Sequence, residues 1–388
     1  MLTYQGFIFS LKEKLIMYRL FQSIGFVFSN LFSRKVYDVV FYYPQHFNRD
    51  ENSENPFFKP YYDLCNRNNL SYIILEEPCV GSKSNTASIP FDFIFYVVQL
   101  LRRVIPLENV IDKDNSIGIW LGKSLLRSFK FKNVVVISKS MLSFFRGLNS
   151  SAKIFDLQHG IIHSNKSDYF INSNVSVHLE RNDVFLLLFG EGFRNILVEE
   201  DSTNYMKNHC FQLGFSESNN ESIHDIFNNN ILITLQFTHD HSKEENLSLL
   251  DSINSFVSKN PNVNFYLKHH PRFNNEVNLS FLFSLENVNI APVHLVECFK
   301  LCSLHATAYS TSVFEAAQYG IPSIIINPLQ KFDYFKSDFR YPLEYSISDF
   351  KDNQIYQKSV EVVMNWKQEY YSPFNELNKG MPNLKAST

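Results

Sequence analysis

The chain has 388 residues, of which 45% are hydrophobic; this exceeds what one hydrophobic core normally serves and suffices for two α/β domains. Its 36 basic and 39 acidic side chains leave a formal charge of −3, so the composition excludes a general attraction to nucleic acid. The five cysteines match neither a disulfide framework nor a zinc site, which indicates a reducing, cytoplasmic compartment.

The N-terminal segment predicts a helix, with neither a secretory signal nor a membrane span. The apolar run at 20–32 is too short for a span and contains Gln, Ser and Asn. The basic residues that flank this phenylalanine-rich run are Lys12, Lys14, Arg19, Arg34 and Lys35. Two interpretations stay open: a helix buried on the first domain, which we expect, or a helix that rests on an anionic membrane surface. The second would place the protein peripherally on the inner face of the cytoplasmic membrane.

Strand and helix patterns alternate through the first half of the chain. Strands are expected at 36–44, 71–78, 133–140, 152–160, 184–190 and 209–215, and helices at 57–70, 91–104 and 116–129. This alternation favours a parallel, doubly wound sheet.

A polar, asparagine-rich stretch at 216–230 then predicts a domain boundary. Beyond it, strands are expected at 230–237, 263–273, 288–292, 303–310 and 321–328, and helices at 243–259, 294–302 and 312–320. The predicted fold is therefore α/β, with an acceptor-binding Rossmann-like domain at 1–220 and a nucleotide-sugar-binding one at 221–350. The helical segment and tail at 351–388 either cover the second domain or cross back to the first.

Three hydroxyls, on Ser310, Thr311 and Ser312, crowd the start of the helix predicted at 312–320. Unpaired N–H groups and the positive end of the helix dipole attract an anion at such a position. A helix cap requires one hydroxyl, and three exceed that need. The run therefore predicts a phosphate site, and a simple helix cap is the alternative.

Ligands of open parallel sheets bind beyond the carboxyl ends of the strands, so polar residues at strand ends become candidates. Two further sets qualify besides the hydroxyl run: the basic set Lys268, His269, His270, Pro271 and Arg272, and the set Gln158, His159 and Gly160. The basic set and the hydroxyl run are two strand–helix steps apart in one predicted domain. One sheet edge can therefore bring both to a single phosphate, although His270 could instead be a buried histidine bonded to main chain.

The sequences KHHP and YSTSVFEAAQYGIPSI resemble the C-terminal half of bacterial GT-B glycosyltransferases that build capsule and lipopolysaccharide. They are most similar to the sialyltransferase-like and polyol-phosphate-transferase-like groups, in which a His-Pro motif and a Ser/Thr motif hold a CMP- or CDP-linked donor. The resemblance covers residues 231–328 well and the first half only in architecture. It implies donor-binding roles for His270, Pro271, Ser310, Thr311 and Ser312, and a place near the ribose for Glu315.

The sequence DLQHG, at 156–160, stands where sialyltransferases of this fold carry an acidic pair followed by glycine. Polyol-phosphate transferases have a His-Gly pair in a similar setting, so the resemblance implies that His159 is the base that deprotonates the acceptor. A histidine, with an ordinary pKa of about 6.5, suits this role near neutral pH. Alternatively, His159 bonds its own turn, His163 is the reactive residue, or Glu76 and Glu77 supply the base. For the two glutamates we expect a solvated strand end.

The predicted enzyme is an inverting, metal-independent glycosyltransferase. It would move a sugar from a nucleotide-sugar donor, CMP-linked in preference to UDP-linked, to a hydroxyl of a surface glycan or lipid-linked oligosaccharide. The nucleotide sugar is the substrate, and no cofactor is expected. The sequence THDHS, at 238–242, is expected to be a solvated loop rather than a metal site. A sugar-nucleotide epimerase of the same fold and an inactive protein of polysaccharide assembly are the alternatives.

Overall fold

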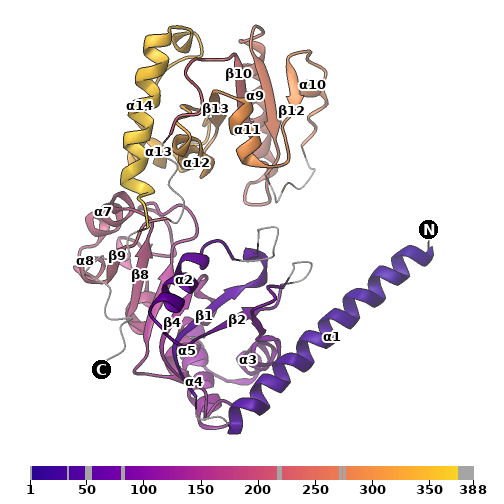
Figure 1. Ribbon diagram of the computed structural model, residues 1–388, viewed down its shortest axis with the longest axis vertical. Coiled ribbons are helices and arrows are strands. Elements are labelled where there is room, and N and C mark those ends of the chain that lie inside the picture. Colours follow the sequence, from indigo (N-terminus) through magenta and orange to yellow (C-terminus); the bar gives the residue numbers. More distant parts are fainter. Residues whose placement is uncertain are drawn as a thin grey trace.

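The computed structural model describes residues 2–32, 35–48, 55–79, 84–215, 221–270, 273 and 277–374, with the backbone alone for residues 2–15 and 331. Two parallel sheets organise the chain, the first between residues 36 and 212 and the second between residues 230 and 325. Figure 1 shows the two units one above the other, with the long helix α14 (Asn353–Tyr370) running from the second toward the first.

The first sheet has seven strands in the order β3-β2-β1-β4-β5-β8-β9, and every neighbouring pair is parallel. The strands are β1 (Val36–Pro44), β2 (Tyr72–Glu77), β3 (Ile89–Pro90), β4 (Lys130–Val136), β5 (Lys153–Leu157), β8 (Val184–Leu188) and β9 (Cys210–Gln212). The accompanying helices are α2 (Lys59–Arg67), α3 (Asp92–Val104), α4 (Val110–Lys123), α5 (Leu142–Leu148), α6 (Val177–Asn182), α7 (Glu191–Glu200) and α8 (Tyr205–His209). A small antiparallel pair, β6 (Phe170–Ile171) and β7 (Asn174–Val175), lies apart from this sheet.

The second sheet has five strands in the order β12-β11-β10-β13-β14, again all parallel. The strands are β10 (Asn230–Thr234), β11 (Asn264–Lys268), β12 (Val288–Ile290), β13 (Leu304–Thr307) and β14 (Ser323–Ile325). The helices are α9 (Lys243–Ser258), α10 (Ser280–Phe283), α11 (Leu295–Leu301), α12 (Ser312–Gln318) and α13 (Tyr334–Ser337).

The central strands are buried on both faces, as the continuous apolar runs of the sequence predict. In β1, Val40 and Tyr42 belong to the hydrophobic cluster on one side of the sheet. Val39, Phe41 and Tyr43 belong to the cluster on the other side. Helices therefore cover both faces of the first sheet, and the prediction of two Rossmann-like domains is confirmed.

The C-terminal helix joins the two units. α14 packs against α12 of the second unit and against α7 of the first. At its end, Phe215 N–H donates to the Ser372 carbonyl at 2.7 Å, and Ser372 N–H donates to the Phe189 carbonyl at 3.2 Å. Gly190 permits this approach, because a Cβ there would lie 2.3 Å from the Glu369 carbonyl oxygen. The chain thus returns to the first unit, and the predicted tail at 375–388 lies outside the described residues.

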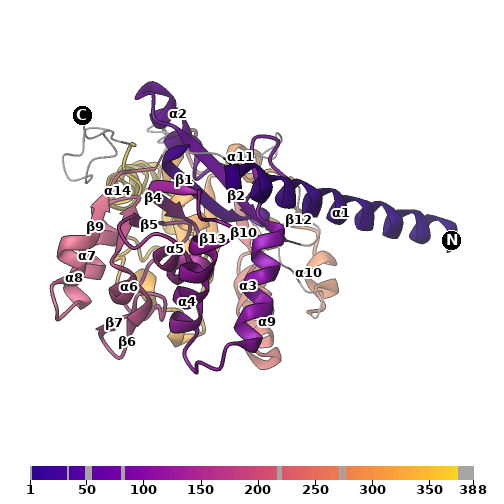
Figure 2. The same ribbon diagram turned by 90° about the horizontal axis from the view of Figure 1, so that it is seen from below.

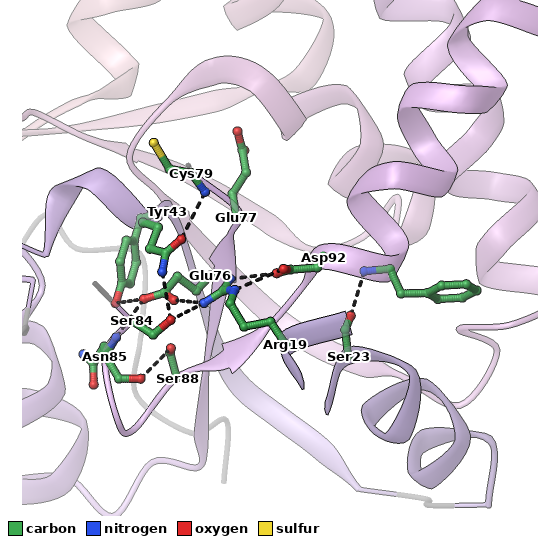
Figure 3. A network of polar contacts seen from close by, with 12 residues as sticks. Arg19, Ser23, Tyr43, Glu76, Glu77, Cys79, Ser84, Asn85, Ser88 and Asp92 are labelled. Carbon is green, nitrogen blue, oxygen red and sulfur yellow. Dashed lines mark hydrogen bonds and ion pairs between the residues drawn. The ribbon is translucent and has the colours of Figure 1, made fainter. Parts of the chain in front are cut away.

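The first helix, α1 (Leu2–Phe32), is only partly packed. Its second half lies on the first domain, whereas its N-terminal end projects away from the body of the molecule in two perpendicular views (Figures 1 and 2). The Arg19 guanidinium, 5% exposed, donates to Glu76 at 2.7 Å and to Asp92 at 2.7 and 3.0 Å (Figure 3). Arg19 is therefore a buried structural cation, which agrees with the expected helix on the first domain and removes Arg19 from the basic residues of the membrane alternative. Among the described helices, none combines the length and apolar character needed to span a bilayer.

Candidate functional site

The second sheet brings its polar strand ends together. β10 lies between β11 and β13, so the residues that follow these three strands share one edge. The basic set follows β11 and the hydroxyl run follows β13, as the sequence predicts. The loop after β10, which contains THDHS, stands between them.

The three hydroxyls of the run point to different surroundings. Ser312, 4% exposed, directs its Oγ into the domain, 2.9 Å from Thr234 Oγ1 and 3.1 Å from His305 Nε2. Ser310 Oγ accepts the Ser312 N–H at 3.2 Å and so caps the start of α12. Thr311 is partly exposed at the same position. Ser310 and Thr311 thus remain candidates for a ligand, whereas Ser312 is part of a buried network.

The basic set is less uniform than its sequence suggests. The Lys268 ammonium donates to the carbonyls of Pro292 and Val293 at 3.0 and 2.6 Å, so it braces the neighbouring loop. His270 is partly exposed, and its carbonyl accepts the Phe273 N–H at 2.9 Å. The predicted site residues Pro271 and Arg272 lie outside the described residues.

Glu315, the residue predicted to lie near the ribose, sits one turn into α12 and is partly buried. Burial and the Glu315 carboxylate together raise the pKa of Tyr371, which lies at the end of α14. This carboxylate is therefore close to the junction with the first domain.

The loop after β10 contributes a histidine that the sequence interpretation missed. His241 is 8% exposed, and its Nε2 bonds the hydroxyl of Tyr309, the residue before Ser310. Phe332 stacks on Tyr309 with ring centroids 4.3 Å apart. The expectation of a solvated THDHS loop is therefore wrong for His241, because two aromatic rings and Asn246 enclose its imidazole. The sequence shows a histidine shortly after a predicted strand, but it does not reveal the partner of that histidine, because Tyr309 is 68 residues away.

The first domain presents the third predicted set at the end of β5. Gln158, 2% exposed, braces the turn: its side chain donates to the Gly160 carbonyl at 2.9 Å and accepts the Phe189 N–H at 2.8 Å. His159 is partly exposed, with Nδ1 3.4 Å from the Leu157 carbonyl oxygen. A Cβ added to Gly160 would meet no atom within 4 Å. The turn is therefore held in place by Gln158, and the His159 ring packs edge-on against Phe47, with ring centroids 5.2 Å apart.

The same loop of the first domain continues to the second domain. His163 stacks on Tyr334, with ring centroids 4.9 Å apart and an interplanar angle of 16°. The Tyr334 hydroxyl donates to the Tyr309 carbonyl at 2.8 Å. Burial, and secondarily the charge of Lys166, lower the pKa of His163. Through Tyr334, the loop after β5 thus meets the loop after β13, and the carboxyl ends of the two sheets face each other.

Of the two glutamates at the end of β2, Glu76 is buried, contrary to the expectation of a solvated strand end, whereas Glu77 is partly exposed. Glu76 is fully buried and accepts a hydrogen bond from Arg19 at 2.7 Å (Figure 3), and another from Asn48 at 2.6 Å. Glu77 accepts the hydroxyls of Tyr42 and Ser140 at 2.6 and 2.9 Å. Both carboxylates are therefore engaged in holding the first domain together.

The described residues contain no group of three or more His, Cys, Asp or Glu side chains that could hold a metal ion. A cavity of about 330 Å³ lies beside β14 and includes Ile325, Asn327 and Lys336 in its lining. None of its lining residues belongs to the predicted sets, so this cavity does not bear on them.

Two Rossmann-like domains with facing sheet ends define the GT-B class of fold. The UDP-GlcNAc 2-epimerase from Neisseria meningitidis bound to UDP-GlcNAc is similar, with a TM-score of 0.50 and 13% identity over 88% of this chain and 97% of the epimerase. The Methanocaldococcus jannaschii UDP-GlcNAc 2-epimerase has a TM-score of 0.49 and 14% identity, over 88% of this chain and 97% of its own. The wall teichoic acid polymerase TagF has a TM-score of 0.49 and 12% identity, over 96% of this chain and 93% of the polymerase.

No family model and no curated protein matches the sequence. At these identities the likeness shows the fold.

Proposed function

We propose that the protein is a glycosyltransferase that moves a sugar from a nucleotide-sugar donor to a hydroxyl of a surface glycan or lipid-linked oligosaccharide. The contact of His163 with Tyr334, and of Tyr334 with Tyr309, carries the proposal. It brings the strand end that holds His159 toward the strand end that holds Ser310 and Thr311. A donor phosphate at one edge and an acceptor hydroxyl at the other would meet between them.

In this mechanism His159 is the general base. If Nδ1 carries the proton that faces the Leu157 carbonyl, Nε2 has the lone pair that a base requires. Nε2 takes the proton of the acceptor hydroxyl, the acceptor oxygen attacks the anomeric carbon, and the bond from that carbon to the nucleotide phosphate breaks. A single displacement of this kind inverts the anomeric centre.

The leaving nucleotide needs hydrogen-bond donors for its phosphate. Ser310, Thr311 and the start of α12 supply hydroxyls and N–H groups, and His270 adds an imidazole. Lys268 would have to exchange its bonds to Pro292 and Val293 before it reached a phosphate, so we give it a lesser role than the sequence suggests. Arg272 and Pro271 keep their predicted roles as a phosphate contact and as part of the His-Pro motif.

The identity of the donor nucleotide can be determined by a direct experiment. We retain CMP-linked sugars as the first expectation, and UDP-linked sugars as the competing one because one structural neighbour is bound to UDP-GlcNAc. A ligand of the native state raises the apparent stability in proportion to its occupancy. Thermal-shift measurements with CMP, CDP, UDP and GDP, each followed by its sugar derivatives, would identify the base. If no nucleotide raised the melting temperature, the proposal would be wrong.

A sugar-nucleotide epimerase is the second candidate, because an epimerase shares the fold over nearly its whole length. Such an enzyme converts UDP-GlcNAc without an acceptor, whereas a transferase leaves the donor unchanged or hydrolyses it slowly. Incubation with UDP-GlcNAc alone, followed by NMR of the sugar, separates the two. Nucleotide binding without conversion, hydrolysis or transfer would instead support an inactive protein of polysaccharide assembly.

A further inference from the structure

The outward face of α1 carries a row of exposed apolar side chains. Met17, Phe21, Phe28 and Phe32 are 50%, 64%, 61% and 86% exposed. At about 100° per residue, these four positions fall within about 60° of one another around the helix axis. They therefore form one stripe along the part of the helix whose side chains the structure describes. Three phenylalanine rings of this stripe are exposed on the surface of the chain.

The opposite face of α1 is fixed to the first domain. Its buried residues are Arg19, Ser23, Phe26, Val27 and Asn30. Their mean direction is roughly opposite to that of the exposed stripe. The buried ion pairs of Arg19 and the hydrogen bond from Phe93 N–H to Ser23 Oγ, 3.0 Å long, set the rotation of the helix. The outward direction of the stripe is thus a consequence of how the helix is anchored.

A second exposed row lies on the neighbouring helix. α3 contacts α1, and its residues Tyr96, Leu100 and Val104 are 47%, 61% and 68% exposed at a spacing of four residues. Exposed apolar rows on two neighbouring helices exceed the scattered single apolar residues of an ordinary protein surface, and larger apolar surface of this kind marks interaction sites.

We propose that α1 binds a lipid bilayer that contains anionic lipid, with the stripe of Met17, Phe21, Phe28 and Phe32 turned into the membrane interface. The charge of the segment supports this occupant. Residues 1–35 contain five basic residues and one acidic residue, Glu13. Arg19 is paired with Glu76 and Asp92, and without it the sequence of this segment still has four basic residues, Lys12, Lys14, Arg34 and Lys35, to one acidic residue. A protein with a net charge of −3 thus has a net positive charge in the sequence segment that contains its apolar stripe, as interfacial helices do.

A second copy of the chain fits the stripe less well. A parallel pair of α1 helices would place Lys14 of one copy beside Lys14 of the other. Such a pair brings like charges together, whereas anionic headgroups attract the basic residues of the segment.

The experiment is co-sedimentation of the full chain with two kinds of vesicle. One is phosphatidylcholine alone, and in the other part of it is replaced by phosphatidylglycerol. We expect the protein to bind the anionic vesicles, and salt to weaken this binding. The double substitution Phe21→Asp and Phe28→Asp should reduce the bound fraction by at least about tenfold, because two apolar side chains no longer enter the interface.

A matched control places the same change elsewhere. Phe281→Asp with Ile290→Asp alters two residues of the second domain that are 54% and 76% exposed, and should leave vesicle binding unchanged. Circular dichroism of both double variants verifies that they fold.

Equal sedimentation of the wild type with and without phosphatidylglycerol would overturn the proposal, as would unchanged binding of the α1 variant. If sedimentation velocity showed a dimer, and the α1 substitutions abolished that dimer, the stripe would bind a second copy of the chain and the membrane proposal would be overturned. This inference does not depend on the proposed activity.

Discussion

The interiors of the two domains contain different kinds of polar group. In the first domain they include ion pairs: Arg19 is paired with Glu76 and Asp92, and Arg102 with Asp114. In the second they are neutral: His305 bonds Thr234 and Ser312 through Nε2, and Ser323 through Nδ1 at 2.8 Å. Burial lowers the pKa of His305 to about 3, so its imidazole is uncharged at neutral pH.

This difference bears on where a phosphate could bind. Hydroxyls and imidazoles can donate hydrogen bonds to an anion, whereas carboxylates only accept them and repel it. In the first domain, Glu76 and Glu77 lie at the carboxyl end of β2, which is paired directly with β1. In the second, hydroxyls and imidazoles follow β10, β11 and β13. This contrast supports our proposal that the nucleotide phosphate binds to the second domain.

The largest effect should come from His159. If His159 is the base, His159→Ala removes general-base catalysis and lowers kcat by about 10²–10⁴, while nucleotide binding persists because the phosphate site is on the other domain. Transfer from the donor, measured beside a thermal shift with nucleotide, tests both parts. His163→Phe is the control, because it keeps a ring on Tyr334. Loss of activity in the His163 variant alone would reassign the base to that residue.

Removal of the buried cation should cost the first domain most of its stability. Arg19→Met leaves the carboxylates of Glu76 and Asp92 buried without their partner, which typically costs about 3–5 kcal/mol. Urea unfolding followed by circular dichroism measures the loss. Lys132→Met is the matched control, since that lysine pairs with Asp38 at 2.8 Å but is half exposed, and should cost less than about 1 kcal/mol. A similar loss in both variants would contradict the assigned role of Arg19.

This role could not be read from the sequence. Arg19 stands in an apolar helical segment and looks like a basic flank, and its partners are 57 and 73 residues away. The sheets, in contrast, were predictable, because buried parallel strands require long apolar runs whatever their neighbours are. The same limit applies to the hydroxyl run, since Ser310, Thr311 and Ser312 are equivalent in sequence. Only the tertiary contacts of Ser312 with Thr234 and His305 separate it from the other two.

The pH dependence of stability should differ in sign between the domains. Burial raises the pKa of Asp156 to about 6, although Lys139 and Lys166 oppose the shift, and its Oδ1 has no hydrogen-bond partner among the described residues. The raised pKa means that the folded state binds this proton more tightly than the unfolded state, where the pKa is about 3.9. Its stabilising contribution is therefore complete below about pH 4 and is lost as the pH rises to about 6. For His305 the lowered pKa means that stability is lost as the pH falls below about 6.5.

Asp156→Asn should remove the first of these dependences. The stability of the variant relative to the wild type should increase by roughly 1–1.5 kcal/mol between pH 5 and pH 8, measured by urea unfolding at both pH values. Asp63→Asn, at an exposed position of α2, is the control and should show no such increase. A constant difference between the Asp156 variant and the wild type at the two pH values would exclude the buried carboxyl as the cause.

The smallest effect tests how the hydroxyl run divides between binding and structure. Thr311→Val preserves the shape of a partly exposed side chain and removes one hydroxyl. If that hydroxyl holds the donor phosphate, nucleotide affinity should fall about tenfold, the value of one hydrogen bond to a charged group, with the melting temperature of the free protein unchanged. Ser312→Ala should do the reverse: it removes the bonds of one buried hydroxyl to Thr234 and His305, which still bond each other, costs about 1 kcal/mol of stability, and spares affinity. Calorimetric titration with the nucleotide that binds best, beside thermal unfolding of both variants, gives the comparison. If Ser312→Ala weakened binding and Thr311→Val did not, the phosphate would be held from inside the domain, and the neutral network around His305 would belong to the binding site rather than to the core.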